Sequence, residues 1–273
     1  MLRRRARRLL RRATGRPHDW ELVPEGWARA HDPLIQGWDV DPVVEAYRRK
    51  LPAFRAAVEG TGPLGVATSP AFPPGRPNVR EQNLVLAFAY ALALASRNAD
   101  RCSVLDWGGG LGFHYLLARA LLPPGVELDY HCKEVSALCA YGREALPELT
   151  FHEDESCLER RYDLVLASSS LQYSERWAEA LTGLAGATGR YLYLTRVPVV
   201  ERVPSFVVLQ RPQRHGLATE YLSWVFNRNE LLACVSATGL ELVREFLCGY
   251  RPKVAGAPEQ DETRGFLFRA AAG

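Results

Sequence analysis

Long hydrophobic runs and paired cysteines are both missing from this sequence of 273 residues. The longest apolar run, residues 84–95, is too short to cross a bilayer and suits a buried helix. None of the six cysteines forms a C-x-x-C pair or a zinc-like Cys/His spacing, so we expect reduced thiols and no metal site. No apolar segment with a cleavage site follows the charged N-terminus. We therefore expect a cytoplasmic protein without a signal peptide.

Acidic residues are missing from the first sixteen positions, which carry eight arginines. The rest of the chain has 26 basic groups against 31 acidic ones, so the body is mildly acidic and the basicity is confined to a tail. We expect this tail, residues 1–16, to be disordered. It is either a solvated terminus or a segment suited to weak contact with an anionic membrane surface. An acidic body gives no strong signal for nucleic-acid binding.

The stretch 17–100 is predicted to be an N-terminal cover of helices and loops. A first helix is expected at 42–59, with Asp41 as its N-cap and Pro42 in its first position. Residues 60–77 are rich in Pro and Gly and are read as a loop. Asn78 and Glu81 have the spacing of a capping box, which predicts a second helix to about residue 96.

The remainder, 101–273, alternates between strand and helix patterns, which is typical of parallel β-α-β units. Strands are predicted at 103–107, 127–133, 149–153, 162–167, 190–195, 241–247 and 265–269. Helices are predicted after the first strand to residue 122 and at 136–145, 176–187 and 227–238, the last with Asn227 as its N-cap, and residues 196–224 are read as an irregular insertion. The last two strands have no helical pattern between them and are predicted to form a hairpin. The fold class is therefore α/β, with a mostly parallel, doubly wound sheet.

A glycine-rich loop follows the first of these strands and reads Asp106-Trp-Gly-Gly-Gly-Leu-Gly112. Glycines at such a turn let the backbone approach a ligand closely. A dinucleotide-binding G-x-G-x-x-G motif would need glycine at position 113 or 115, where Phe113 and Tyr115 stand, and the P-loop G-K-[ST] is absent. The acid at the start of the loop would repel a pyrophosphate. It suits a cationic ligand, such as the ammonium of a methionine moiety.

An acidic residue also closes the second predicted strand. Glu134 lies 22 residues after Gly112. In folds of this kind, an acid at the end of the second strand binds the hydroxyls of a ribose. The alternative is a solvated charge at a strand end.

The stretch from about residue 80 to 270 resembles the class I (Rossmann-like) S-adenosylmethionine-dependent methyltransferases. The likeness lies in Val104-Leu-Asp-Trp-Gly-Gly-Gly-Leu-Gly112, in Glu134, in His152-Glu-Asp-Glu155 and in Tyr162-Asp-Leu-Val-Leu-Ala-Ser-Ser-Ser-Leu-Gln-Tyr173. The resemblance implies a seven-stranded sheet with an antiparallel last strand, and S-adenosyl-L-methionine as the cofactor. It implies that the cofactor is bound by Asp106, Gly108, Gly109, Gly110, Gly112, Glu134, Asp154, Ser168 and Ser169, with Asp154 meeting the adenine.

A narrower resemblance joins the glycine loop to Thr195-Arg-Val-Pro198, Phe206-Val-Val-Leu-Gln210 and Phe226-Asn-Arg228. These letters are similar to a group of uncharacterised methyltransferases, some of them associated with bacterial surface polysaccharide loci. That likeness does not determine a substrate.

Three residues are candidates for the chemistry because ligands bind beyond the carboxyl ends of the strands. Tyr173 follows the fourth strand, where it either borders the transferred methyl or belongs to the core. Arg196 ends the fifth strand, where it either binds a carboxylate or phosphate of the acceptor or forms a surface salt bridge. His215, in the insertion, is the candidate general base, with a plain surface histidine as the alternative.

These features predict a methyltransferase that methylates an oxygen or nitrogen of a small molecule or a saccharide. Two alternatives stay open: a nucleotide-cofactor oxidoreductase, and a non-catalytic binding protein on the same fold.

Overall fold

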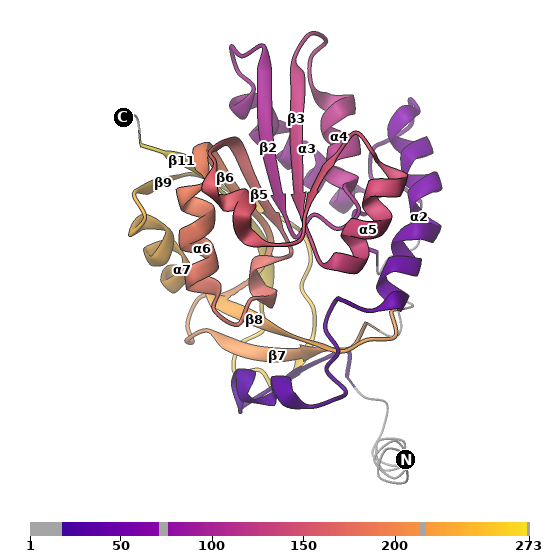
Figure 1. Cartoon of the computed structure of the whole chain (residues 1–273). Coiled ribbons are helices and arrows are strands. Elements are labelled where there is room, and N and C mark those ends of the chain that lie inside the picture. Colours follow the sequence, from indigo (N-terminus) through magenta and orange to yellow (C-terminus); the bar gives the residue numbers. More distant parts are fainter. Residues whose placement is uncertain (1–17, 71–75, 213–216, 272–273) are drawn as a thin grey trace.

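The computed structural model describes residues 18–70, 76–212 and 217–271, which form one eleven-stranded sheet with helices on both faces (Figure 1). The arginine-rich tail lies outside these residues. The strands are β1 (Trp20–Leu22), β2 (Arg101–Trp107), β3 (Glu127–Lys133), β4 (Thr150–His152), β5 (Tyr162–Ser168), β6 (Thr188–Val200), β7 (Phe206–Gln210), β8 (Tyr221–Asn227), β9 (Leu240–Leu247), β10 (Val254–Ala255) and β11 (Glu262–Ala270). The α-helices are α2 (Asp41–Glu59), α3 (Val79–Ala95), α4 (Phe113–Leu121), α5 (Ser136–Ala145), α6 (Trp177–Gly186) and α7 (Arg228–Ser236), and the short 3-10 helices are η1 (Gly26–His31), η2 (Glu155–Glu159) and η3 (Leu171–Tyr173).

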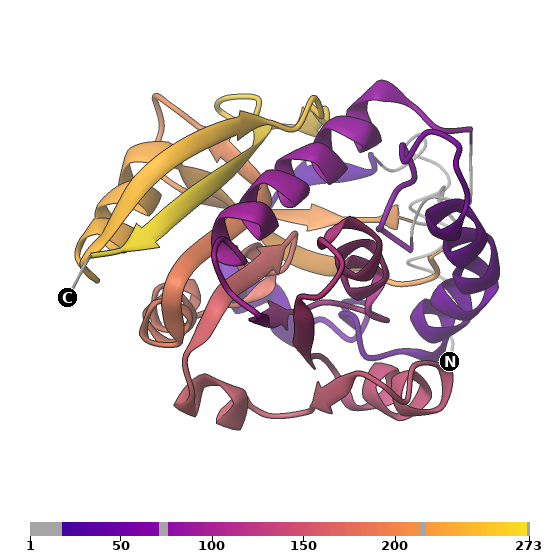
Figure 2. The same ribbon diagram turned by 90° about the horizontal axis from the view of Figure 1, so that it is seen from above.

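The seven predicted strands are all present and are neighbours in the order β4-β3-β2-β5-β6-β11-β9. The first five of these run parallel, whereas β11 is antiparallel to both β6 and β9. The predicted sheet with its antiparallel last strand is therefore confirmed. Seen from above, β9 and β11 form one edge of the molecule and α2 lies at the other (Figure 2).

The two faces of the sheet bury alternate residues of each strand, because successive side chains point to opposite faces. Val104 and Leu164 pack beneath α2, α3, α4 and α5. Their neighbours Leu105 and Val165 pack beneath α6 and α7. Strands covered on both faces read as continuous apolar runs, and these runs made the parallel strands recognisable in the sequence.

Two predicted N-caps are confirmed and one is wrong. The Asn78 side chain accepts a hydrogen bond from the Glu81 amide, and the Asn227 side chain accepts from the two amides that open α7. Asp41, in contrast, is already the first residue of α2, and Val40 takes the cap position with no side-chain hydrogen bond. Pro42 then sits in the first turn, where its missing N–H costs nothing.

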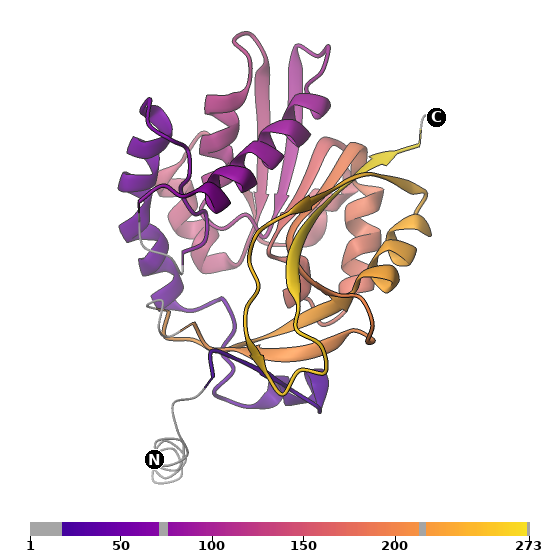
Figure 3. The same ribbon diagram turned by 180° about the vertical axis from the view of Figure 1, so that it is seen from behind.

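The prediction that 196–224 is an irregular insertion is wrong, because about half of its residues lie in strands. β6 continues to Val200, and an antiparallel hairpin of β7 and β8 follows; β8 pairs with β6. The N-terminal cover is also not purely helical, since β1 pairs with β7 and β10 pairs with β1. Figure 1 shows β7 and β8 crossing below the carboxyl ends of the parallel strands, and Figure 3 shows the chain between β9 and β11 reaching the same level. Both β7 and β8 are buried on both faces. Their sequences therefore lack the alternation of apolar and polar residues that marks a half-buried strand.

All six cysteines are free thiols, and five of them are buried. Among the described residues, no helix has both the length and the apolar character needed to cross a membrane.

Candidate active site

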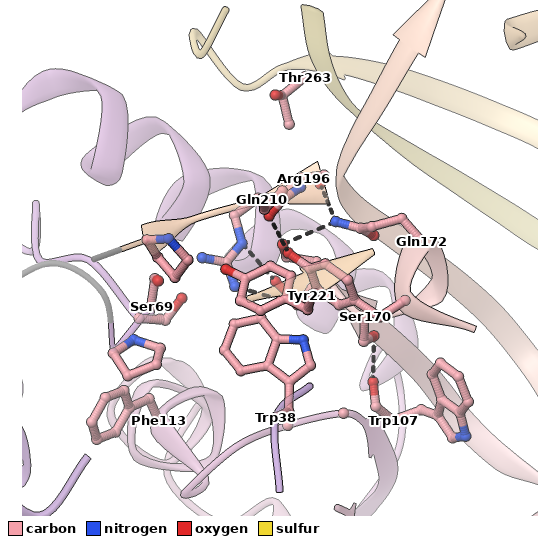
Figure 4. A pocket seen from close by; sticks show the side chains of 18 of the residues that line it. Trp38, Ser69, Trp107, Phe113, Ser170, Gln172, Arg196, Gln210, Tyr221 and Thr263 are labelled. Carbon is pink, nitrogen blue, oxygen red and sulfur yellow. Dashed lines mark hydrogen bonds between the residues drawn. The ribbon is translucent and has the colours of Figure 1, made fainter. Parts of the chain in front are cut away.

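A cavity of about 460 Å³ opens at the carboxyl ends of β2, β3, β5 and β6 (Figure 4). Its other walls come from the N-terminal cover and from the β7–β8 hairpin, which contribute Trp38, Tyr47, Gln210 and Tyr221. A volume of this size is typical of sites for small molecules and cofactors. The wall that carries the predicted glycine loop and the wall that carries Arg196 thus enclose one space.

The glycine loop divides into residues that face the cavity and residues that protein covers. Gly108 and Gly109 line the cavity, whereas Gly110 and Gly112 do not. Gly110 has a φ of +62°, and a Cβ there would collide with the ring and hydroxyl of Tyr47. Gly110 is therefore glycine because α2 packs against the loop, in addition to the turn that its backbone makes.

Asp106 lies beneath the loop and not on the cavity wall. Its carboxylate is fully buried; Oδ2 accepts a hydrogen bond of 3.0 Å from the Tyr130 hydroxyl and lies 3.5 Å from Nδ1 of His114. Oδ1 is buried and has no hydrogen-bond partner among the described residues. A buried carboxylate with an unsatisfied oxygen makes the neighbouring part of the cavity favourable for a positive charge.

Glu134 lines the cavity beside the loop, as predicted. Its Oε2 accepts a hydrogen bond of 2.8 Å from the Gly110 amide, and its Oε1 accepts one of 2.9 Å from the Val135 amide. Burial raises the pKa of this carboxyl, and the two backbone donors act in the opposite direction. Glu134 and the glycine loop are thus joined by a direct hydrogen bond across adjacent strand ends.

Asp154 does not line the cavity, although the preceding resemblance assigns it to the adenine. It is the N-cap of η2, and its Oδ1 accepts hydrogen bonds from the amide and hydroxyl of Ser156. These bonds lower the pKa of Asp154. Its neighbour Glu155 lines the cavity instead.

Ser168 and Ser169 both line the cavity at the end of β5. Ser169 has a φ of +56°, a left-handed conformation that is uncommon for a residue other than glycine. Its amide donates to the Thr195 carbonyl, which extends the pairing of β5 with β6 by one residue. Non-glycine residues held in this region cluster at functional sites.

Tyr173 lines the cavity within a cluster of aromatic side chains that includes Trp38 and Tyr221. Its ring centroid is 5.1 Å from that of Trp38 and 5.1 Å from that of Tyr221, and its hydroxyl donates to Gln210 Oε1 at 3.3 Å. Burial raises the pKa of Tyr173, so its hydroxyl stays protonated at neutral pH. It can donate a hydrogen bond there but is unsuited to removing a proton.

Arg196 lines the cavity and contacts Ser168, the last residue of β5. Its Nε donates to Ser168 Oγ at 3.1 Å, and its Nη2 donates to the Ser168 carbonyl at 3.3 Å. It makes no ion pair with a carboxylate of the described residues, so the surface salt bridge considered for it is not found within that part of the chain. His215 lies outside the described residues, and its role stays a prediction.

Sequence reasoning missed two residues that shape the cavity. Tyr47 comes from α2, and its contact with the loop depends on packing between distant segments. Arg211, only 5% exposed, forms a bidentate ion pair with Glu21 at 2.8 Å for both contacts, which ties β1 to the end of β7. Neither residue belongs to a local motif, and only the apolar spacing of α2 offered any signal.

No family model and no curated protein sequence matches this chain. Among solved structures, it is similar to the magnesium protoporphyrin IX methyltransferase of Synechocystis PCC 6803 with bound SAM, at 14% identity and a TM-score of 0.46, over 86% of this chain and 100% of that one. It is also similar to the CcbJ methyltransferase of Streptomyces caelestis, at 18% identity and a TM-score of 0.45, over 83% and 98% of the two chains. A third is CalS10, an amino pentose methyltransferase of Micromonospora echinaspora, at 16% identity and a TM-score of 0.44, over 69% and 91%. Likeness at these identities and TM-scores does not identify a function.

Proposed function

We propose that the protein is an S-adenosylmethionine-dependent methyltransferase that acts on a small molecule or a saccharide. The observation that supports the proposal most is the hydrogen bond between Glu134 and the Gly110 amide, because it joins the acid at the end of β3 to the glycine loop beside one cavity. Gly108, Gly109 and Glu134 would hold the cofactor. Ser168 and Ser169 close the same wall.

The electrostatics of the loop fit a cation. The carboxylate of Asp106 lies beside Gly109, where a Cβ would meet its Cγ and Oδ2 at 2.5 Å, and its Oδ1 is buried without a hydrogen-bond partner among the described residues. An anionic environment of this kind favours a ligand that carries an ammonium or a sulfonium. It disfavours the pyrophosphate of a nicotinamide or flavin dinucleotide.

The start of α4 argues in the same direction. Dinucleotide-binding folds place the pyrophosphate on a free helix N-terminus. Here Phe113 occupies the first position of α4, and its ring stacks on Phe54 at 4.3 Å and lies 5.4 Å from the ring of Tyr47. Aromatic side chains therefore cover the helix end that a phosphate would need.

When bound, the cofactor supplies a methyl carbon made electrophilic by its sulfonium, which an oxygen or nitrogen of the acceptor displaces in line. The chain itself orients the acceptor and keeps water away from it. Trp38 and Tyr221, stacked with ring centroids 4.4 Å apart, form a flat wall against which a planar molecule or a sugar ring can lie. Tyr173 and Gln210 border that wall with polar groups.

A proton leaving a hydroxyl or amine acceptor needs a destination. His114 lines the cavity, and its Nδ1 lies 3.5 Å from Asp106 Oδ2. A proton held on Nδ1 by that carboxylate would leave Nε2 as the acceptor, in the way that a carboxylate fixes a histidine tautomer elsewhere. We propose His114, together with the predicted His215, as the histidines to test for this role.

The experiment is a calorimetric titration of the full chain with S-adenosylhomocysteine and, separately, with NAD. We expect binding of S-adenosylhomocysteine only, and a loss of about 10-fold or more in affinity in Glu134→Gln, because a charged acceptor of ribose hydroxyls becomes neutral. Glu127→Gln is the matched control, since Glu127 is an exposed carboxylate at the opposite end of β3. Binding of NAD alone would favour the oxidoreductase, and binding of neither ligand would favour a non-catalytic protein.

A further inference from the structure

Charged side chains of both signs line the cavity, and two of the three arginines among its described lining residues pair with a carboxylate. Arg80 pairs with Glu81, and Arg211 pairs with Glu21 and approaches Glu220 at 3.5 Å. Arg196 differs from both of them. Within the described part of the chain, its guanidinium donates hydrogen bonds only to the hydroxyl and carbonyl oxygens of Ser168, both of which are neutral.

The guanidinium of Arg196 is fixed in place but not saturated. Two of its nitrogens bind Ser168, and its Nη1 has no hydrogen-bond partner among the described residues. A guanidinium presents five donors in a planar fork that matches the two oxygens of a carboxylate or phosphate. Because the oxygens that hold the Arg196 guanidinium are neutral, its positive charge is not compensated by them and is available to a ligand.

Arg196 lies at an irregularity in the pairing of β6 with β11. β11 pairs with β6 at Phe266–Leu194 and again at Arg264–Val197, so Thr195 and Arg196 together face the single residue Gly265. This is a β-bulge, and Arg196 takes a φ of +55° in it. Bulges beside active sites serve to redirect a side chain, and strained residues persist where function requires them.

Buried polar atoms without hydrogen-bond partners among the described residues also line the cavity that holds Arg196. Trp38 Nε1 and Gln210 Nε2 are buried donors without partners among the described residues, whereas Gln172 Oε1 is the matching acceptor (Figure 4). The pKa of the nearby Lys50 is lowered to about 8, by burial first and by the charge of Arg196 second, although Glu81 acts in the other direction. A ligand with anionic oxygens would satisfy these donors and relieve the repulsion between the two cations.

We propose that Arg196 binds an anionic group of the acceptor, a carboxylate or a phosphate, while the body of the acceptor lies against Trp38. This rests on the proposed methyltransferase function, because it names the substrate class of the same cavity. The cofactor's own carboxylate is the competing anion. The position of Arg196 on β6 favours the acceptor, since β5 separates β6 from the glycine loop on β2.

The test uses the full chain saturated with S-adenosylhomocysteine and titrated with benzoate, phenyl phosphate and the neutral benzyl alcohol. We expect the wild type to bind at least one anion more tightly than the alcohol, and the preferred anion tells a carboxylate site from a phosphate site. Arg196→Gln should lose about 10-fold or more of the anion affinity, because a charge-assisted pair of hydrogen bonds is removed. Arg196→Lys should recover part of it, as a point charge without the fork.

Two further variants separate a direct role from a structural one. Ser168→Ala removes the hydroxyl that orients Arg196 and should weaken the anion but not the alcohol; Ser168 is then a positioning residue. Arg176→Gln, at an exposed arginine of the α6 N-cap, should bind as the wild type does.

The proposal is overturned if neither anion binds the wild type better than the alcohol, or if Arg196→Gln binds the anions as the wild type does. It is also overturned if Arg196→Gln weakens S-adenosylhomocysteine as much as it weakens the anions, since Arg196 would then belong to the cofactor. A wild type that fails to bind S-adenosylhomocysteine contradicts the methyltransferase proposal instead. The anion titrations on the ligand-free protein would still decide the role of Arg196.

Discussion

The hydroxyl of Tyr47 occupies the space that a side chain at Gly110 would need. This contact joins α2 of the N-terminal cover to the glycine loop, so the cover is part of the site's architecture. Tyr47 also lines the cavity, and burial raises its pKa well above the ordinary value for tyrosine. The loop therefore depends on a residue more than sixty positions earlier in the chain.

Gly110→Ala should lower the free energy of unfolding by about 2–4 kcal/mol, because it combines a left-handed backbone with a collision against Tyr47. Gly125→Ala is the matched control. Gly125 also has a positive φ, of +95°, but nothing lies within 4 Å of a Cβ there. The Gly125→Ala variant should lose only about 1–2 kcal/mol of unfolding free energy, from the left-handed backbone conformation alone. Urea unfolding of the two variants measures the difference, and equal costs would contradict the packing role of Tyr47.

Asp261 should make the protein less stable as the pH rises from about 4 to 7. Its carboxyl is 2% exposed, neither oxygen has a hydrogen-bond partner among the described residues, and burial raises its pKa from 3.8 to about 7. In this window the folded state binds the proton that the unfolded state releases, so stability falls as pH rises.

Asp261→Asn should remove this slope and stabilise the protein at pH 8, on the order of 2–4 kcal/mol. Thermal unfolding between pH 4 and pH 8 follows the effect. Glu127→Gln, at an exposed carboxylate, should keep the slope of the wild type. A variant Asp261→Asn with an unchanged slope would show that another group titrates.

Arg211→Met should destabilise the protein by about 2–4 kcal/mol, because it removes a buried cation that pairs with Glu21 and lies 3.5 Å from the buried carboxylate of Glu220. The loss should be local at first, since Arg211 joins the end of β7 to Glu21 of β1. Hydrogen exchange of the amides of Trp20 and Leu22 should therefore accelerate more than exchange in β2.

Arg202→Gln supplies the contrast for Arg211. Arg202 pairs with Glu259, but its side chain is 82% exposed, and pairs at such positions contribute about 1 kcal/mol at most. If the two arginine variants were equally destabilising, burial would not be the reason for the importance of Arg211.

Asn227→Ala should cost about 1 kcal/mol, because the side chain accepts from the amides of Asn229 and Glu230 at the start of α7. Asn227→Ser keeps a capping oxygen and should restore most of the loss. Denaturant midpoints of the two variants measure it. A serine variant as weak as the alanine variant would assign the effect to the contacts that the Asn227 amide group donates to Glu201 and Val203.

The parallel core could be predicted closely because its signals are local. The sequence ranges expected for β3 and α5 agree with the structure residue for residue, since a proline and glycine turn and a strand-end acid bound them clearly. Glu134 was found for the same reason: the carboxyl ends of neighbouring parallel strands must meet at one edge of the sheet.

The cavity walls formed by the N-terminal cover and the β7–β8 hairpin could not be predicted, because they are built by contacts between distant segments. The strands β7 and β8 are buried on both faces and show no alternation of apolar and polar residues. Their pairing with each other, with β1 and with β6 therefore leaves no signal in the sequence. Asp154 and Glu155 show a finer limit. The orientation of η2 determines which of these two adjacent acids faces the cavity. That orientation cannot be predicted from the local sequence.

The pairing of Trp20 with Val254 brings together residues near opposite ends of the described chain. A ribosome delivers β1 long before either of its partner strands, so this strand must wait unpaired until β7 and then β10 emerge. Contacts of such sequence separation are slow to form. Completion of the cavity, which Trp20 lines, is therefore expected to be a late event in folding that follows the synthesis of β10.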